Sequence, residues 1–166
     1  MTRDQYVRMT NAVRTITARL PGKAAFLRLP TLICAAFYIY ALFTLIFRQD
    51  MRLLRTIIVP AVCFGVVTAL RPLIGRQRPY DRFGTPPVGS YKPGKGKSMP
   101  SRHTASAAAI ASAAAYAFSS PALTALMLAL CLLIAALRVL SGQHYVSDVL
   151  AALAVSFLIS LIGYCL

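Results

Sequence analysis

Between two long apolar runs lies the polar stretch Arg138-Val-Leu-Ser-Gly-Gln-His144-Tyr-Val-Ser-Asp148. The chain has only two histidines and four acidic residues, so a histidine four positions before an aspartate is a distinctive pair. If a helix begins near Gln143, His144 and Asp148 lie on the same face of it. The carboxylate can then hold one imidazole nitrogen and leave the other free to attack an electrophile. Arg138 precedes the Ser-Gly turn and supplies a fixed cation for an anionic substrate. Taken alone, this stretch is explained equally well as a polar turn at the level of lipid headgroups.

Two further polar stretches adjoin apolar runs. Residues 100–103, Pro-Ser-Arg-His, open the next run upstream and contain the only other histidine, His103. Arg71 and Arg78 lie seven positions apart at the end of an earlier run. Because seven residues are nearly two helical turns, a continuous helix would place both arginines on one face, about 10 Å apart. The proline and glycine between them weaken that prediction, and Pro79 would end the helix.

Together the three stretches resemble the type 2 phosphatidic acid phosphatase superfamily of integral-membrane phosphatases, whose site is similar to that of soluble vanadium haloperoxidases. The matching signatures, in order, are Arg71-x6-Arg78-Pro79, Pro100-Ser101-x-His103 and Arg138-x5-His144-x3-Asp148. This chain has Arg71 where the family usually has Lys, Arg102 where it has Gly, and Leu137 where it has Ser. Arg71 keeps the charge. Arg102 bears on the site, because Gly there normally lets the backbone approach phosphate.

The side chains in these signatures can be given chemical roles. Arg71, Arg78 and Arg138 can neutralise phosphoryl oxygens and stabilise the charge of a transition state. Ser101, with the free N–H groups of a helix beginning there, adds an anion site. His103 can protonate a departing oxygen, or it can simply mark the headgroup boundary. The resemblance implies that His144 is phosphorylated and that water then hydrolyses the phosphohistidine, without metal or cofactor. Arg102 joins the candidate substrate-binding residues, although contact with headgroups is the default interpretation for Arg76, Arg82 and Arg102.

The composition points to a small membrane protein. Hydrophobic residues make up 58% of the 166 residues and charged residues only 13%. The length suits a single domain, residues 1–166, without a repeat. The net charge of +14 lies mainly at the ends of apolar runs, so it indicates lipid phosphate rather than nucleic acid. The chain has no Glu and lacks Cys/His ligand spacing, so we expect neither a metal site nor a disulfide framework.

The apolar runs predict an all-α polytopic bundle with about five spans, preceded by an amphipathic helix on the membrane surface. The predicted spans are Leu29–Phe47, Thr56–Leu73, two within Thr104–Leu137 divided at Ser119-Ser120-Pro121, and Val149–Leu166. Within residues 2–20, Tyr6, Val7, Val13, Ile16 and Leu20 form a loose apolar stripe among arginines. The alanine-rich half between Thr104 and Phe118 is typical of a helix packed among neighbours. The Gly/Pro-rich connection 75–99 should cap the site from the aqueous side.

Counting crossings places all three signatures at one membrane face. We therefore predict a multi-pass phosphatase of the cell membrane that acts on a lipid phosphate or diphosphate. Lys92, Lys95 and Lys97 favour a polyprenyl diphosphate. Phosphatidic acid, phosphatidylglycerol phosphate and a lipid phosphotransferase are alternatives, and an anion transporter is the non-enzyme alternative.

The membrane orientation is predicted in two opposite ways. The face with the site and the N-terminus carries most of the basic residues, whereas the other face has only Arg48, Arg52 and Arg55. The positive-inside rule therefore favours a cytoplasmic site. The family resemblance implies a site on the outer face, and we follow the resemblance. The sequence does not indicate an oligomeric state.

Overall fold

The computed structural model describes residues 1–18, 23–89, 91, 93 and 97–165, and over these residues it contains helices and no strand. The predicted all-α bundle is therefore confirmed. The helices are α1 (Arg3–Ala18), α2 (Lys23–Phe47), α3 (Arg52–Ile74), α4 (Pro79–Phe83), α5 (Arg102–Phe118), α6 (Pro121–Leu140) and α7 (Val146–Cys165).

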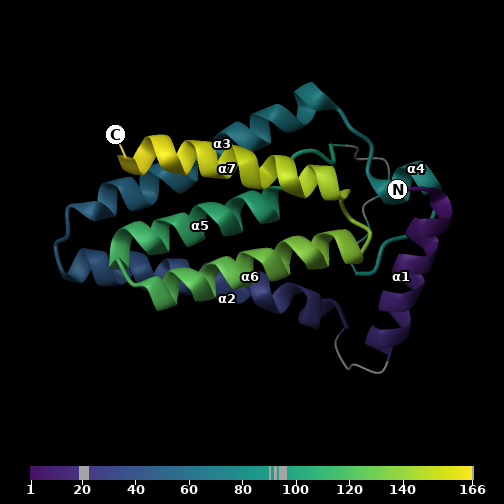
Figure 1. Ribbon diagram of the computed structural model, residues 1–166, viewed down its shortest axis with the longest axis horizontal. Coiled ribbons are helices and arrows are strands. Elements are labelled where there is room, and N and C mark those ends of the chain that lie inside the picture. Colours follow the sequence, from purple (N-terminus) through teal and green to yellow (C-terminus); the bar gives the residue numbers. More distant parts are fainter. Residues whose placement is uncertain (19–22, 90, 92, 94–96, 166) are drawn as a thin grey trace.

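Four helices, α2, α3, α6 and α7, are long and apolar enough to cross a membrane. The fifth predicted span corresponds to α5, which has 17 residues and contacts all four of them. A helix of that length is about 26 Å long, slightly less than the hydrocarbon core of a bilayer. Figure 1 shows α5 in the middle of the bundle, stopping short of the ends of α6 and α7 on the side where α7 begins. The polar connections between the helices lie beyond this end of α5.

The central position of α5 follows from its small side chains. Alanine lets neighbouring backbones approach closely, so one helix can contact four others. The buried alanines of α5 are Ala105, Ala107, Ala109, Ala111, Ala113, Ala114 and Ala117. By contrast, the Leu-rich face of α6 is exposed, with Leu126 at 64% and Leu132 at 60%. The predicted packing of α5 among its neighbours is confirmed, and the exposed leucines of α6 are consistent with a lipid-facing helix.

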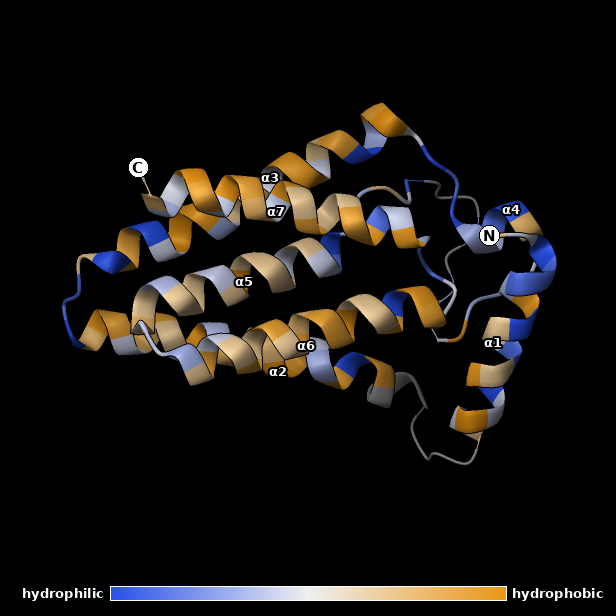
Figure 2. Ribbon diagram, viewed as in Figure 1, coloured by the Kyte–Doolittle hydropathy of each residue, from blue (hydrophilic) through white to orange (hydrophobic). Residues whose placement is uncertain are grey.

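Polar residues gather at the two ends of the bundle, and apolar residues cover its length (Figure 2). The C-terminus lies at one end, whereas the N-terminus, α1 and α4 lie at the other (Figure 1). Helix α1 crosses this second end at a steep angle to the long helices. Its predicted stripe is divided: Tyr6 is fully buried against protein, while Ile16 is 71% exposed. Tyr6 thus contacts the bundle rather than lipid.

Candidate active site

His144 and Asp148 meet at the start of α7. The Nδ1 atom of His144 lies 3.5 Å from Oδ2 of Asp148, and both side chains are almost completely buried. The predicted pairing is confirmed, but the predicted helix start near Gln143 is wrong. Helix α7 begins at Val146, so His144 belongs to the turn before it. The turn is closed by the backbone N–H groups of Gln143 and His144, which donate to the carbonyl of Arg138 at 3.2 and 3.1 Å.

Ser98 fixes the tautomer of His144. The Ser98 hydroxyl donates to Oδ2 of Asp148 at 2.5 Å, so its hydrogen is already engaged. Its oxygen lies 3.4 Å from Nδ1 of His144 and can therefore only accept there. With two acceptors beside it, Nδ1 must carry the proton, which leaves the lone pair on Nε2. No hydrogen bond among the described residues engages Nε2, so this nitrogen is available for attack.

The carboxylate of Asp148 is held on every side. Besides Ser98 and His144, the backbone N–H of Tyr145 donates to Oδ2 at 3.0 Å. Arg76 donates from Nη1 to Oδ1 at 2.8 Å, and its guanidinium lies 4.2 Å from the centroid of the Tyr145 ring. The default interpretation of Arg76 as a headgroup contact is therefore wrong, because its guanidinium is bonded within the site.

Burial is the main influence on the protonation of His144. Removal from water lowers the pKa of its imidazole, and the positive charges of Arg78 and Arg71 act in the same direction. The bond to Asp148 opposes this effect without reversing it. The imidazole is therefore neutral at pH 7, as a nucleophile must be.

The charges of Arg71 and Arg78 act on His144, and the carbonyl of Arg138 closes the turn that carries it. The ion pairs found in the described part of the chain are Arg52–Asp50, Arg76–Asp148 and His144–Asp148, so none of the three arginines takes part. Arg71 donates to the carbonyl of Lys97, and Arg138 donates to Oε1 of Gln143 at 2.8 Å. Asp148 partly offsets the charge of Arg71, but none of the three guanidinium groups forms one of these ion pairs, so their charge can serve an anionic ligand.

Several cationic side chains line a pocket of about 410 Å³ at this end of the bundle. His103 lines it, and burial lowers the pKa of its imidazole to about 3, with the charges of Arg138, His144, Arg102 and Arg78 acting in the same direction. The other polar residues of the lining are Arg28, Thr31, Arg78, Tyr80, Arg102, Arg138, Ser141 and Gln143. His144 follows Gln143 in the sequence and acts on His103 electrostatically, but its own side chain, like that of Arg71, is not part of the lining. The three sequence signatures therefore converge on one cationic pocket.

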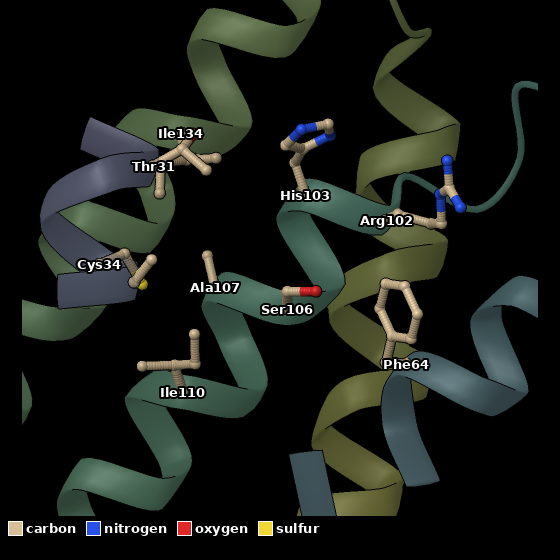
Figure 3. Close-up of a pocket in the computed structure, with 10 residues that line it drawn as sticks. Thr31, Cys34, Phe64, Arg102, His103, Ser106, Ala107, Ile110 and Ile134 are labelled. Atoms are coloured by element: carbon tan, nitrogen blue, oxygen red, sulfur yellow. The ribbon is translucent and has the colours of Figure 1, made fainter. Parts of the chain in front are cut away.

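A second pocket, of about 370 Å³, extends from the first along the bundle. Both pockets are lined by Thr31, Arg102 and His103. Figure 3 shows His103 and Ile110 on α5, with Cys34 on α2 and Phe64 on α3 arranged around the second space. Apart from its shared polar end and Ser106, this lining is hydrophobic. A phosphate in the first pocket would thus have an apolar space next to it.

The sequence profile of the PAP2 superfamily matches residues 51–166, a range that contains all three signatures. The chain belongs to the PAP2 superfamily. A search of curated proteins finds no match. Among solved structures, the chain resembles a transmembrane PAP2-type phosphatidylglycerolphosphate phosphatase from Bacillus subtilis, with a TM-score of 0.71 and 19% identity. That match covers 97% of this chain and 83% of the other. LpxE from Aquifex aeolicus is similar with a TM-score of 0.69 and 17% identity, over 98% and 94% of the two chains.

Two positions of the PAP2 signatures differ from the sequence-based expectations. Arg71 and Arg78 do not share a helix, because Gly75 ends α3 in the left-handed conformation with φ 60°. Pro79 begins α4 instead of ending a helix, since a proline fits the first helical position well. The two arginines still act on the same histidine, His144.

The middle PAP2 signature starts α5. Ser101 is fully buried and is the N-cap residue; its N–H donates to the carbonyl of Asp148 at 3.1 Å, which joins the starts of α5 and α7. Its hydroxyl accepts a hydrogen bond from Thr104 at 3.1 Å. Arg102 is the first residue of α5 and has helical geometry, so the backbone there does not require the usual glycine. Its side chain lines both pockets.

Several residues of this PAP2 site were not found from the sequence. Ser98, Arg28 and Gln143 carried no signal beyond their polarity near the end of an apolar run. Arg28 immediately precedes the first predicted span, which is the one hint available for it. Lys92 and Lys95, predicted to bind a second phosphate, lie outside the described residues. Lys97 is described, and its side chain is exposed.

Proposed function

We propose that this membrane PAP2 protein hydrolyses a lipid phosphate or diphosphate through a phosphohistidine on His144. The observation that carries the proposal is the cationic pocket beside a neutral histidine whose Nδ1 is held and whose Nε2 is free. Arginines outside the ion pairs favour a phosphoryl group with two negative charges. Burial at the end of a membrane bundle favours a phosphate carried by a lipid.

In the first step, the Nε2 lone pair of His144 attacks phosphorus and the bond to the leaving oxygen breaks. Arg71, Arg78 and Arg138 balance the charge on the phosphoryl oxygens during the transfer. Asp148 stabilises the positive charge that develops on the imidazole ring. The negative charge of the bound phosphate favours a proton on His103. His103 gives this proton to the leaving oxygen, which departs as the hydroxyl of an alcohol from a monophosphate or of a lipid monophosphate from a diphosphate.

In the second step, water attacks the phosphohistidine. His103, now neutral, takes a proton from the water as its oxygen bonds to phosphorus. The P–N bond breaks, inorganic phosphate leaves, and His144 returns to the neutral Nδ1–H tautomer. The net reaction consumes one water molecule and requires no metal. Among the described residues, no group of three or more His, Cys, Asp or Glu side chains could hold a metal ion. Metal independence itself remains a prediction.

A polyprenyl diphosphate is the favoured substrate. Arg28 and Arg102 line the same pocket as Arg78 and Arg138, and a second phosphate needs these additional donors. Phosphatidic acid and phosphatidylglycerol phosphate are the alternatives. The similarity to a phosphatidylglycerolphosphate phosphatase supports the latter at the level of the fold only. Transfer of the phosphoryl group to a lipid or sugar acceptor is the remaining alternative for the same site.

The decisive experiment measures phosphate release from polyprenyl diphosphate, phosphatidic acid and phosphatidylglycerol phosphate in detergent, with glycerol 3-phosphate as the soluble control. We expect lipid substrates to be hydrolysed and the diphosphate to be fastest. Equal or slower diphosphate hydrolysis would contradict the diphosphate preference. Product that forms only when an acceptor alcohol is added would identify a transferase.

His144→Ala should abolish both turnover and the acid-labile phosphoenzyme trapped from labelled substrate. His103→Ala is the matched control, because a substrate with a good leaving group, such as p-nitrophenyl phosphate, needs no proton from His103. This variant should lose lipid hydrolysis but still form the phosphoenzyme from the aryl ester. A phosphoenzyme in His144→Ala would refute the assignment of the nucleophile.

The absence of metal chemistry needs its own test. Activity should persist in excess chelator and fall in vanadate, which adopts the five-coordinate geometry of the transferring phosphoryl group. Inhibition by chelator that a divalent ion reverses would contradict the proposed reaction.

We also propose that the site faces the outer side of the cell membrane, as the family resemblance implies.

A further inference from the structure

Helix α1 is docked on the end of the bundle through one face. Tyr6 and Thr10 are completely buried, and Thr17 is 96% buried. These positions are four and eleven residues apart, which places them on one side of an α-helix. The opposite side, which includes Arg8, is exposed. The docked face therefore belongs to the protein, and the exposed face is available to lipid headgroups.

Tyr6 contacts the turn that carries His144. Its hydroxyl lies 3.3 Å from the carbonyl oxygen of Gly142 and 3.1 Å from that of Thr85, and it can donate to either. Its ring packs against Phe83 with the ring centroids 5.3 Å apart. Burial raises the pKa of the Tyr6 hydroxyl to about 12, so the group remains a donor at physiological pH. A residue near the N-terminus thus bonds a peptide 136 positions later in the chain.

The close contact between Tyr6 and the turn requires glycine at position 142. Its φ is 76°, which glycine adopts readily, and a Cβ atom there would lie only 2.6 Å from the Tyr6 hydroxyl oxygen. The carbonyl of the preceding residue, Ser141, accepts from the N–H of Val88 at 2.8 Å. Residues outside the turn, Val88 and Tyr6, therefore donate hydrogen bonds to two successive carbonyls of the turn, those of Ser141 and Gly142. His144 follows two residues after Gly142.

We propose that Tyr6 is a positioning residue for the nucleophile. By holding the Gly142 carbonyl, it orients the peptide that leads to His144, so the site is complete only when α1 is docked. This inference rests on the proposed function for its catalytic consequence, although the docking geometry stands independently of it. Tyr6 lies outside residues 51–166, the range matched by the family profile, and it is not part of the three PAP2 signatures.

Tyr6→Phe tests the role of the hydroxyl while keeping the ring. The matched control is Tyr38→Phe, because the Tyr38 hydroxyl also donates to a backbone carbonyl, that of Thr56, at 2.9 Å. This hydrogen bond joins α2 to α3 and does not involve the site. We expect kcat for lipid phosphate hydrolysis to fall about 10-fold in Tyr6→Phe with KM nearly unchanged, as slight misplacement of a nucleophile would cause. Tyr38→Phe should retain the wild-type kcat. Both variants should melt within a few degrees of each other.

Hydrogen exchange provides a readout that does not require turnover. The amides of residues 142–145 should exchange about 2- to 10-fold faster in Tyr6→Phe, which corresponds to the loss of one hydrogen bond. An unchanged kcat in Tyr6→Phe, or an equal fall in Tyr38→Phe, would overturn the inference. If the wild-type protein released no phosphate from any lipid, the proposed function would fail. The exchange rates would then decide the positioning role alone, and unchanged exchange would overturn it.

Discussion

At the scale of single residues, the chemistry of His144 depends on a serine hydroxyl and a buried carboxylate. Ser98 and Asp148 both present acceptors to Nδ1, and burial keeps the ring neutral. The histidine therefore has its lone pair on one defined nitrogen before any substrate arrives. Such preorganisation lowers the reorganisation required in the transition state.

The lowered pKa of His144 predicts an unusual titration. A folded-state pKa below the ordinary value of about 6.5 means that the ring stays neutral as the pH falls through that value and is protonated only at lower pH. Because the chain has two histidines, His103→Gln leaves a single imidazole to observe by ¹⁵N NMR in detergent. We expect the neutral Nδ1–H tautomer to predominate at pH 6.5, where an ordinary histidine would be half protonated. A spectrum of the other tautomer, or half-protonation at or above pH 6.5, would contradict this prediction.

Arg76→Ala should lower kcat by about 10- to 100-fold with little change in KM, because the buried Asp148 loses a charged partner and the orientation of His144 loosens. Arg76→Lys should recover part of the activity, because one nitrogen of Arg76, Nη1, makes the hydrogen bond to Asp148 and a lysine ammonium group can also donate such a bond. Arg82→Ala is the control, because Arg82 is an exposed arginine of the same connection. A rise in KM with unchanged kcat would contradict this positioning role for Arg76.

The residues that could be predicted from the sequence are those with a characteristic spacing. His144 and Asp148 are four positions apart, and His103 opens an apolar run, so their roles could be proposed before the fold was known. Arg76 resembled any other arginine at a membrane boundary, since its partner is 72 positions away. Tyr6 matched an apolar stripe and gave no indication of whether protein or lipid covers it.

At the scale of secondary structure, the sequence predicted the helices but not all of their ends. Uncharged runs specify the long helices because every backbone polar group in lipid needs an internal partner. The start of α7 at Val146 could not be read from hydropathy. It depends on the turn closed onto the carbonyl of Arg138. Similarly, the end of α3 is set by the left-handed conformation of Gly75, while Pro72 is accommodated within the helix.

Helices α3 and α7 approach each other closely at Gly163. A Cβ atom at this position would lie 2.4 Å from Cγ2 of Val59, so Gly163→Ala should destabilise the bundle by about 1–3 kcal/mol. Gly65→Ala is the matched control, because nothing lies within 4 Å of its Cβ position and alanine favours the helix. Adding Val59→Ala to Gly163→Ala should restore part of the lost stability. Unfolding in a denaturing detergent measures these differences in the free energy of unfolding. Equal effects of the two glycine substitutions would contradict the prediction, because they would show that α3 and α7 can move apart at position 163 without loss of stability.

At the scale of the whole molecule, the site and α1 lie at one end of the bundle and the C-terminus at the other (Figure 1). Most basic residues lie at the site end, but many of them have structural or substrate-binding explanations. At the opposite end, Arg52 donates to the carbonyl of Ala117 at 3.0 Å and pairs with Asp50. The charge distribution therefore reflects the local chemistry at both ends as well as the direction of insertion.

Cysteine labelling in intact cells distinguishes the two orientations. Asn11 on α1 and Gln49 at the opposite end are both exposed. Of the native cysteines, Cys34, Cys63 and Cys131 are buried, so only the exposed Cys165 must first be replaced. For a site on the outer face, a membrane-impermeant maleimide should label Asn11→Cys directly, and Gln49→Cys only after permeabilisation. The reverse pattern would place the site in the cytoplasm, as the positive-inside rule predicts.

The two pockets that share Thr31, Arg102 and His103 determine how substrate concentration must be expressed. A ligand with its phosphate in one pocket and its first methylene groups in the other arrives by lateral diffusion within the membrane, not from bulk water. The rate then depends on the mole fraction of substrate in the surface. Adding inert detergent at a constant amount of substrate should therefore slow the reaction by surface dilution, even though nothing inhibitory has been added.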